Sequence, residues 1–124
     1  MRVTYYDTAQ STPATATALD AQAGSDEDRI LKKIIIGKPS SGAILVVYHP
    51  NNAVFGATTN IAFKHTFPTF SATNTNGISP VVIDFTAGGG PSGTNGMVLS
   101  GGGSFTTDTA MQVTFLWTNP DDEV

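Results

Sequence analysis

Apolar residues occupy every second position of several short segments, and this period of two is the strongest constraint on the fold. Successive side chains of a β-strand point to opposite faces, so each such set would line one buried face. No segment has a convincing helical period of 3.6 residues. Leu116 breaks the alternation by adding an apolar side chain on the opposite face. The alternating sets are Ile61, Phe63, His65 and Phe67, then Val81, Ile83 and Phe85, then Met111, Val113, Phe115 and Trp117.

Turn-forming residues separate these segments, in clusters rich in Gly, Asn, Pro and Ser such as residues 88–96 (GGGPSGTNG). Short strands between such turns predict an all-β, single-domain antiparallel β-sandwich, jelly-roll-like, with an immunoglobulin-like strand order left open. The expected strands are Ile30–Ile36, Ala43–Tyr48, Asn60–Phe67, Pro80–Phe85, Gly96–Ser100 and Ala110–Trp117. Met1–Tyr6 and residues 103–106 bring the number to seven or eight.

Two of these strands are continuously apolar, at Ile34–Ile36 and Ile44–Val47. Strands that are covered on both faces have this character. The second cover would be the N-terminal region of the same chain or another subunit.

Residues 7–28 differ from the rest because they are rich in Ala, Thr and Ser and contain one large aliphatic residue, Leu19. Such a stretch buries little apolar area and is expected to be an extended arm, a long surface loop or at most a short helical turn around Ala18 to Ala23. The predicted organisation is an N-terminal strand and arm at 1–28, a β-sandwich domain at 29–118, and an acidic tail at 119–124.

Charge is scarce and unevenly placed. Only 13% of the residues are charged, against about 25% in a typical globular chain. The balance is made up by 18 Thr, 9 Ser, 7 Asn and 13 Gly. All six Lys and Arg residues fall in residues 1–64, so the second half has five acids and no cation. Nucleic acids and anionic membranes need basic patches, and neither is an expected partner.

Candidate catalytic and metal-binding groups are few. The chain has no Cys and two His residues, His49 and His65, whereas a metal site needs three or four converging ligands. His65 is expected to pack in the sandwich and His49 to lie in a solvated turn. The acidic clusters 26–28 and 121–123 lack calcium-loop spacing, and we interpret them as solvated charge.

The glycine runs have no Lys and no following helix, so they are interpreted as turns and not as phosphate-binding loops. No Ser or Thr lies in a nucleophile-elbow pattern. The sequence therefore predicts no enzyme, no metal and no cofactor. Loop aromatics that stack on sugars would be an alternative use of Tyr5, Tyr6, Tyr48, Phe55 and Phe70, although core or interface packing is the simpler interpretation.

No targeting segment is expected, because the first residues (MRVTYYDTAQ) lack the apolar stretch of a signal peptide. The longest apolar run, Ala43 to Tyr48, is too short to span a bilayer.

The segment Arg29 to Pro39 (RILKKIIIGKP), followed by Val81 to Phe85 (VVIDF) and Asn95 to Leu99 (NGMVL), resembles small β-sandwich virion proteins of tailed bacteriophages. The strand Ala110 to Trp117 corresponds to the Thr- and Val-rich strand that closes such domains. The resemblance covers residues 29–117 and consists of strand and turn patterns without a catalytic signature.

This resemblance implies a structural role, that of a head decoration or cement protein that is made in the host cytoplasm and binds the outer capsid surface. The implied partners are the major capsid protein or another virion protein, and further copies of the chain, with a trimer favoured. Strand addition by the N-terminal segment would suit this role. The residues expected at subunit or capsid interfaces are Arg2, Val3, Tyr5, Tyr6, Leu19, Ile34 and Ile36.

Two alternatives stay open. One is another virion component, such as a head fibre, neck or tail accessory module, and the other is a carbohydrate-binding β-sandwich module. Under the arm hypothesis, deleting residues 1–28 is expected to leave a folded β domain that no longer binds capsids.

Overall fold

The computed structural model describes residues 2–9, 17–19, 27–39, 41–53, 57–69, 80–86, 96–109 and 111–120. Nine strands and no α-helix lie in these ranges. All the strand pairs are antiparallel, as the sequence pattern predicts. The strands are β1 (Arg2–Ala9), β2 (Thr17–Ala18), β3 (Arg29–Lys38), β4 (Ile44–Pro50), β5 (Ile61–Thr66), β6 (Val81–Asp84), β7 (Met97–Leu99), β8 (Gly102–Thr107) and β9 (Met111–Thr118).

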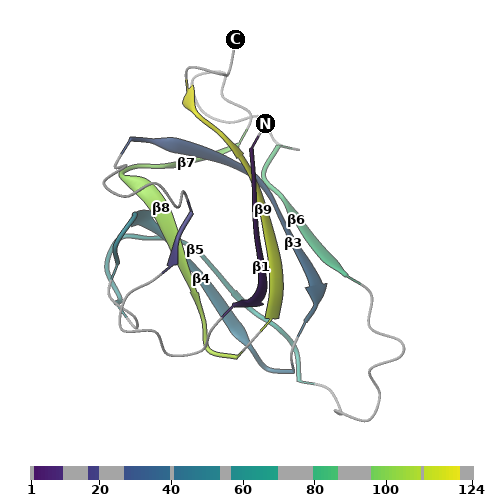
Figure 1. Cartoon of the computed structure of the whole chain (residues 1–124). Helices are drawn as coiled ribbons and strands as arrows, with labels where there is room; N and C mark the ends of the chain where they lie inside the picture. Colours follow the sequence, from purple (N-terminus) through teal and green to yellow (C-terminus); the bar gives the residue numbers. More distant parts are fainter. Residues whose placement is uncertain are drawn as a thin grey trace.

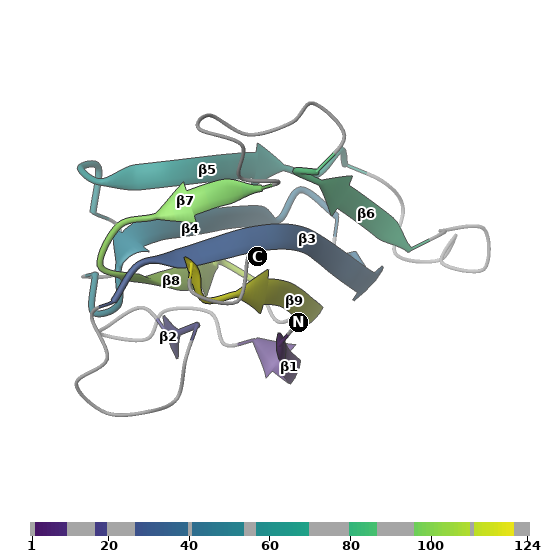
Figure 2. The same ribbon diagram turned by 90° about the horizontal axis from the view of Figure 1, so that it is seen from above.

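The strands form two sheets (Figure 1). Sheet A has the order β1-β9-β3-β6, and β7 also pairs with β3, beside its first residues. Sheet B has the order β2-β8-β4-β5. Figure 2 shows the order of sheet A across the molecule, from β1 through β9 and β3 to β6. The first and the last strand of the chain therefore lie side by side, because β1 pairs with β9.

One hydrophobic core joins the two sheets, and the period-two pattern supplies it. In β9 the side chains at alternate positions are buried, from Met111 to Trp117, and the residues between them are half-buried. The core cluster takes Leu31, Ile34, Ile36, Val113 and Phe115 from sheet A and Leu45, Val47 and Phe105 from sheet B.

A β-bulge interrupts the alternation in β3. Leu31 lies opposite Trp117 and Lys33 lies opposite Leu116, so Lys32 is the extra residue between them. The bulge returns Ile34 and Ile36 to the inner face after the two lysines. It explains why the run from Leu31 to Ile36 does not alternate strictly in sequence although its strand has one buried face.

The structure differs from the sequence prediction in two details. Thr17–Ala18 forms β2, a strand that the sequence pattern does not predict, and it accounts for a ninth strand beside the predicted seven or eight. The strand predicted at residues 103–106 is β8, and it begins at Gly102 and Gly103, in a glycine run that is also predicted to turn. Both have positive φ values (103° and 80°), which glycine adopts without the steric cost of a Cβ.

Candidate functional site

The predicted interface residues of the N-terminal segment lie on β1. Arg2, Val3 and Tyr5 are exposed. Tyr6 also belongs to β1, opposite Val113, but its side chain lies outside the described part of the structure. This part of the expected interface is therefore brought together on one edge strand of sheet A.

The other three predicted interface residues lie inside the molecule. Leu19 is 1% exposed, and Ile34 and Ile36 are completely buried in the core cluster. Their apolar character is used between the two sheets of the same chain. In this arrangement they offer no surface to a partner, because inward-facing side chains of a strand are covered by the opposite sheet.

The described part of residues 1–28 is joined to the rest of its own chain by specific contacts. The Thr4 hydroxyl donates a hydrogen bond to the Leu19 carbonyl at 2.7 Å and accepts one from Trp117 Nε1 at 2.9 Å. The Leu19 amide donates to the Gly103 carbonyl at 3.0 Å. These bonds connect β1, the end of β2, β8 and β9.

Gly103 makes room for this docking. A Cβ added at Gly103 would lie 2.7 Å from Leu99 Cδ1 and 3.4 Å from Leu19 Cδ2. Glycine is therefore needed at position 103 for two reasons: the positive φ of the backbone and the close approach of the Leu19 side chain. The GGG run in the sequence is the local signal for such a feature, although it does not name the residue that approaches.

The outward-facing side of sheet A carries at least one apolar residue on each of the strands β1, β9, β3 and β6. The register places Val3 of β1 opposite Leu116 of β9, and Ile35 of β3 opposite Val82 of β6. Directly opposite residues share a face, and Tyr5 and Ile35 both lie opposite Thr114, so these apolar side chains belong to one surface. We define the outer A surface by five residues: Val3, Tyr5, Ile35, Val82 and Leu116.

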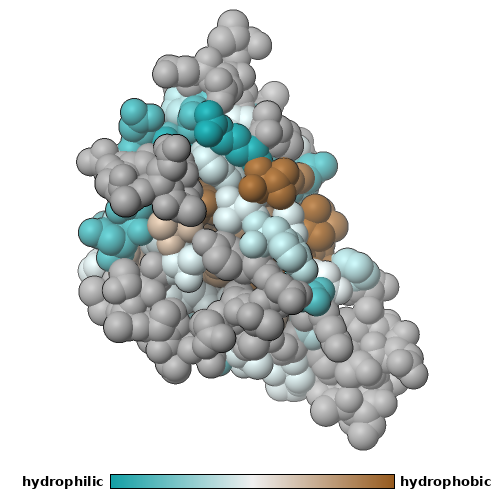
Figure 3. Space-filling view, in the orientation of Figure 1, coloured by the Kyte–Doolittle hydropathy of each residue, from teal (hydrophilic) through white to brown (hydrophobic). Residues whose placement is uncertain are grey.

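Three members of the outer A surface are more than half exposed: Val3 at 62%, Tyr5 at 57% and Val82 at 56%. Ile35 and Leu116 are half-buried. Figure 3 shows hydrophobic residues gathered over this side of the molecule. Exposed apolar residues grouped on one face of a sheet mark an interaction site more often than isolated apolar residues do.

The sequence pattern indicates this surface only in part. Val3 and Tyr5 were expected at an interface, and Leu116 was noted as an apolar residue on the wrong face. Ile35 and Val82 were missed as interface candidates, because joining them to Val3 requires the order of the strands. The sequence signal for the outer A surface is an apolar residue at an outward position of each strand.

A salt bridge borders the outer A surface. Lys33 Nζ lies 3.8 Å from Asp84 Oδ2, and these residues are opposite each other on β3 and β6. The pKa of the Asp84 carboxyl is lowered chiefly by hydrogen bonds from the Thr86 hydroxyl and amide, which outweigh its small desolvation, and to a smaller extent by Lys33.

We expect Asp84→Asn to show how this carboxylate contributes to stability. A carboxyl group whose pKa is lower in the folded state stabilises that state above its unfolded pKa, and the contribution is lost as the pH falls through the folded pKa. The free energy of unfolding should therefore be lower in Asp84→Asn than in the wild type at neutral pH, and the difference should shrink in acid. Urea unfolding at a series of pH values measures it. A difference that does not change with pH would contradict this assignment.

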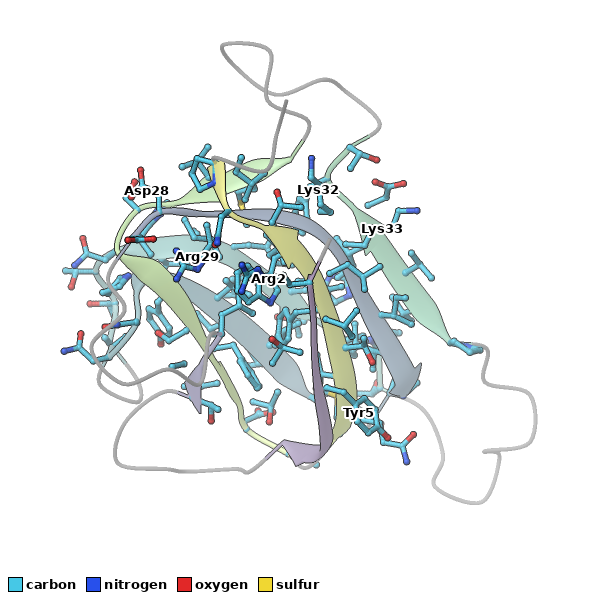
Figure 4. All side chains as sticks on the ribbon, turned by 45° about the horizontal axis from the view of Figure 1, so that its top comes forward. Arg2, Tyr5, Asp28, Arg29, Lys32 and Lys33 are labelled. Carbon is cyan, nitrogen blue, oxygen red and sulfur yellow. The ribbon has the colours of Figure 1, made fainter. Side chains whose placement is uncertain are left out.

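Two arginines reach the indole ring of Trp117 at one end of sheet A. The guanidinium carbon of Arg2 lies 5.6 Å from the ring centroid, and that of Arg29 lies 5.3 Å from it. Arg29 is buried and donates to the carbonyls of Glu27 and Asp28, both at 3.1 Å. Figure 4 shows Arg2 and Arg29 at this end and Tyr5 further along β1. The geometry is that of cation–π packing, which stabilises the start of β1.

The two histidines make contacts with different sets of residues. His49 Nδ1 accepts a hydrogen bond from the Ser100 amide at 3.2 Å. The His65 ring stacks with Phe63 at 6.3 Å and meets Phe67 edge-on at 4.6 Å. Among the described residues, no three His, Cys, Asp or Glu side chains gather into a group that could hold a metal ion.

The remaining candidates fall into two sets. Tyr48, considered above for stacking on sugars, is buried and donates through its hydroxyl to the Ala57 carbonyl at 3.1 Å. Phe55, Phe70 and the acidic residues 121–123 lie outside the described residues. Over the ranges that the structure describes, no helix is long and apolar enough to cross a membrane.

Comparison with known proteins gives no relative: no family model, no curated protein and no solved structure matches this chain.

Proposed function

We propose that the chain is a β-sandwich of the jelly-roll type. The support is a nested pattern of pairs: β1 with β9, β2 with β8, β3 with β6, and β4 with β5. A chain that is folded once into a long hairpin and then rolled up pairs its strands in this way, and β7 is then a short addition that pairs with the first residues of β3. Jelly rolls are frequent in viral capsid proteins and in lectin domains.

We further propose that this is a phage virion structural protein that decorates the outer capsid surface and stabilises the shell. The single observation that carries the proposal is the outer A surface, an exposed apolar area on a domain of low charge. A protein that coats a shell needs a rigid fold and a surface that packs against other protein. Its proposed partner is the major capsid protein, and its proposed location is the capsid exterior.

The geometry of the surface suits that use. Val82 and Tyr5 lie near opposite edges of sheet A, so a capsid protein would be contacted over the width of the sheet and not at one point. The backbone of regular strands is already ordered before binding, which lowers the entropic cost of association. The low charge of the domain removes most of the cost of burying ions.

Co-sedimentation with assembled capsids of the phage that encodes the chain tests the proposal. Wild-type protein is expected to pellet with the shells, and Val82→Lys is expected to lose most of this binding because it places a charge in the apolar contact. Thr66→Lys is the matched control, since Thr66 is exposed on β5 of sheet B. Val82→Lys binding at the wild-type occupancy would contradict the proposed contact.

The same particles separate the alternative roles. A decoration protein covers the shell in many copies, so immunogold label restricted to the neck or tail would favour another virion component. A carbohydrate-binding module needs two or three exposed aromatic rings in a shallow groove, and Tyr5 is the one aromatic side chain exposed among the described residues. Binding of oligosaccharides by a monomer would favour that module instead.

A further inference from the structure

The edges of the two sheets differ in how they are protected against pairing with another chain. Exposed sheet edges are commonly blocked by a charged residue, a proline or a very short strand. At the far edge of sheet A, β6 has four residues and ends at Asp84. In sheet B, β2 has two residues, and β5 has the exposed Lys64 at its centre.

β1 is less protected along its centre. It has eight residues, and its two charged residues, Arg2 and Asp7, leave the four residues between them without a charge or a proline. Its one strand partner among the described residues is β9. Alternate backbone N–H and C=O groups of an edge strand point away from its partner, and among the described residues no strand pairs with the side of β1 that faces away from β9.

The contacts of Thr4 decide what kind of pairing is available. Its hydroxyl is bonded to Leu19 and Trp117 of the same chain, on the inner side of β1. These bonds hold β1 in its own sheet, so exchange of the whole strand with a neighbour would break them. Pairing at the edge of β1 that faces away from β9 leaves them intact.

The sequence of β1 is complementary to itself in one register. If two copies pair antiparallel about a twofold axis at Thr4, Val3 of each copy lies opposite Tyr5 of the other. Both residues belong to the outer A surface, so the pair lies on one face, as directly opposite residues must. Pairs of an aromatic and a β-branched residue are among the favourable cross-strand combinations.

Neighbouring registers are poorer. Moving the axis to Val3 leaves only the residues from Arg2 to Thr4 to pair. Moving it to Tyr5 extends the pairing into the irregular region between Tyr6 and Ala9, where the ladder with β9 shifts register. In the register centred on Thr4, all the residues of the regular part of the strand, from Arg2 to Tyr6, are paired.

We propose that β1 is a dimerisation edge, through which two copies of this chain pair antiparallel about Thr4 and join their A sheets into one. The outer A surface then continues from one copy to the other. The pairing requires no capsid, so it stands apart from the proposed function.

The mass of the purified full chain in solution, measured by sedimentation equilibrium, tests the proposal. The wild type is expected to have twice the chain mass of 12.9 kDa. Tyr5→Lys places a charge opposite Val3 at two symmetric positions and should raise the dimer dissociation constant about tenfold or more. Circular dichroism should show an unchanged fold, since Tyr5 is exposed.

Val82→Lys is the matched control, because Val82 lies on the same surface with the same exposure but at the far edge. It is expected to keep the wild-type dissociation constant. A wild type that is monomeric at every concentration overturns the proposal. Equal weakening by Val82→Lys and Tyr5→Lys also overturns it, because that result would indicate contact through the whole outer A surface and not through the edge.

Disulfide trapping tests the register independently, because the chain contains no Cys. The Cα atoms of directly opposite residues lie about 4.5–5.5 Å apart, within the reach of a disulfide. A mixture of Val3→Cys and Tyr5→Cys chains should cross-link on mild oxidation, well above either variant alone. A mixture that forms no more cross-linked dimer than the separate variants would refute the Thr4 register.

Discussion

Replacing Phe115 with alanine is expected to lower the free energy of unfolding by about 3–5 kcal/mol. Phe115 is completely buried at the centre of β9, and its ring centroid lies 4.6 Å from that of Phe105 on β8. The substitution removes apolar contacts between the two sheets and leaves a cavity that close-packed neighbours fill only in part. Urea unfolding followed by fluorescence or circular dichroism measures the change.

Leu116→Ala provides the control on the same strand. Leu116 is the next residue, half-buried on the outer A surface, and its truncation removes no contact between the sheets. Its cost should be clearly smaller than that of Phe115→Ala. A loss below about 1 kcal/mol for Phe115→Ala would mean that the inner and outer faces of β9 are reversed.

Leu19→Ala is expected to cost about 2–5 kcal/mol, which is a core-sized effect from a residue in an otherwise small and polar stretch. Leu19 is 1% exposed and belongs to the core cluster, and its amide bonds to Gly103. Val82→Ala is the control, because Val82 is exposed and its truncation should change stability by no more than about 0.5 kcal/mol. Chemical denaturation of both variants under one condition gives the comparison.

The result for Leu19 also bears on the N-terminal segment as a whole. If Leu19→Ala were as mild as Val82→Ala, residues 17–19 would not be part of the core, and a free arm would be the better description. A large loss means that deleting residues 1–28 removes β1, β2 and a core side chain together. We then expect the deletion to lower stability, so single substitutions on the outer A surface test capsid binding more cleanly.

Much of the fold could be predicted from local sequence. The alternation at Met111 to Trp117 identifies the buried face of β9, and the same rule holds for Val81, Ile83 and Phe85, which pack against the core. Gly- and Asn-rich clusters mark where strands end. These features are readable because the direction of a side chain in a strand depends only on its position, whatever the partner strand is.

The candidate site required more than the sequence. Ile34 and Ile36 were expected at an interface because continuous apolar runs occur in strands that are covered twice, but both side chains fill the space between the two sheets. The bulge at Lys32 sets which residues of β3 point inward, and a bulge is defined by the register with β9. Val82 gains its importance from lying on the same surface as Val3, a relation between strands that are far apart in the sequence.

The sequence by itself determined that the chain forms β-strands, where most of them lie, and which side chains of each strand are apolar. The tertiary structure alone decided the docking of Leu19 at β8, the membership of the outer A surface and the position of β1 at an edge. The physical reason is that strand propensity and alternation are local, whereas pairing between residues as distant as Val3 and Leu116 is not. A two-residue strand such as β2 is stabilised almost wholly by the neighbours that it meets after folding.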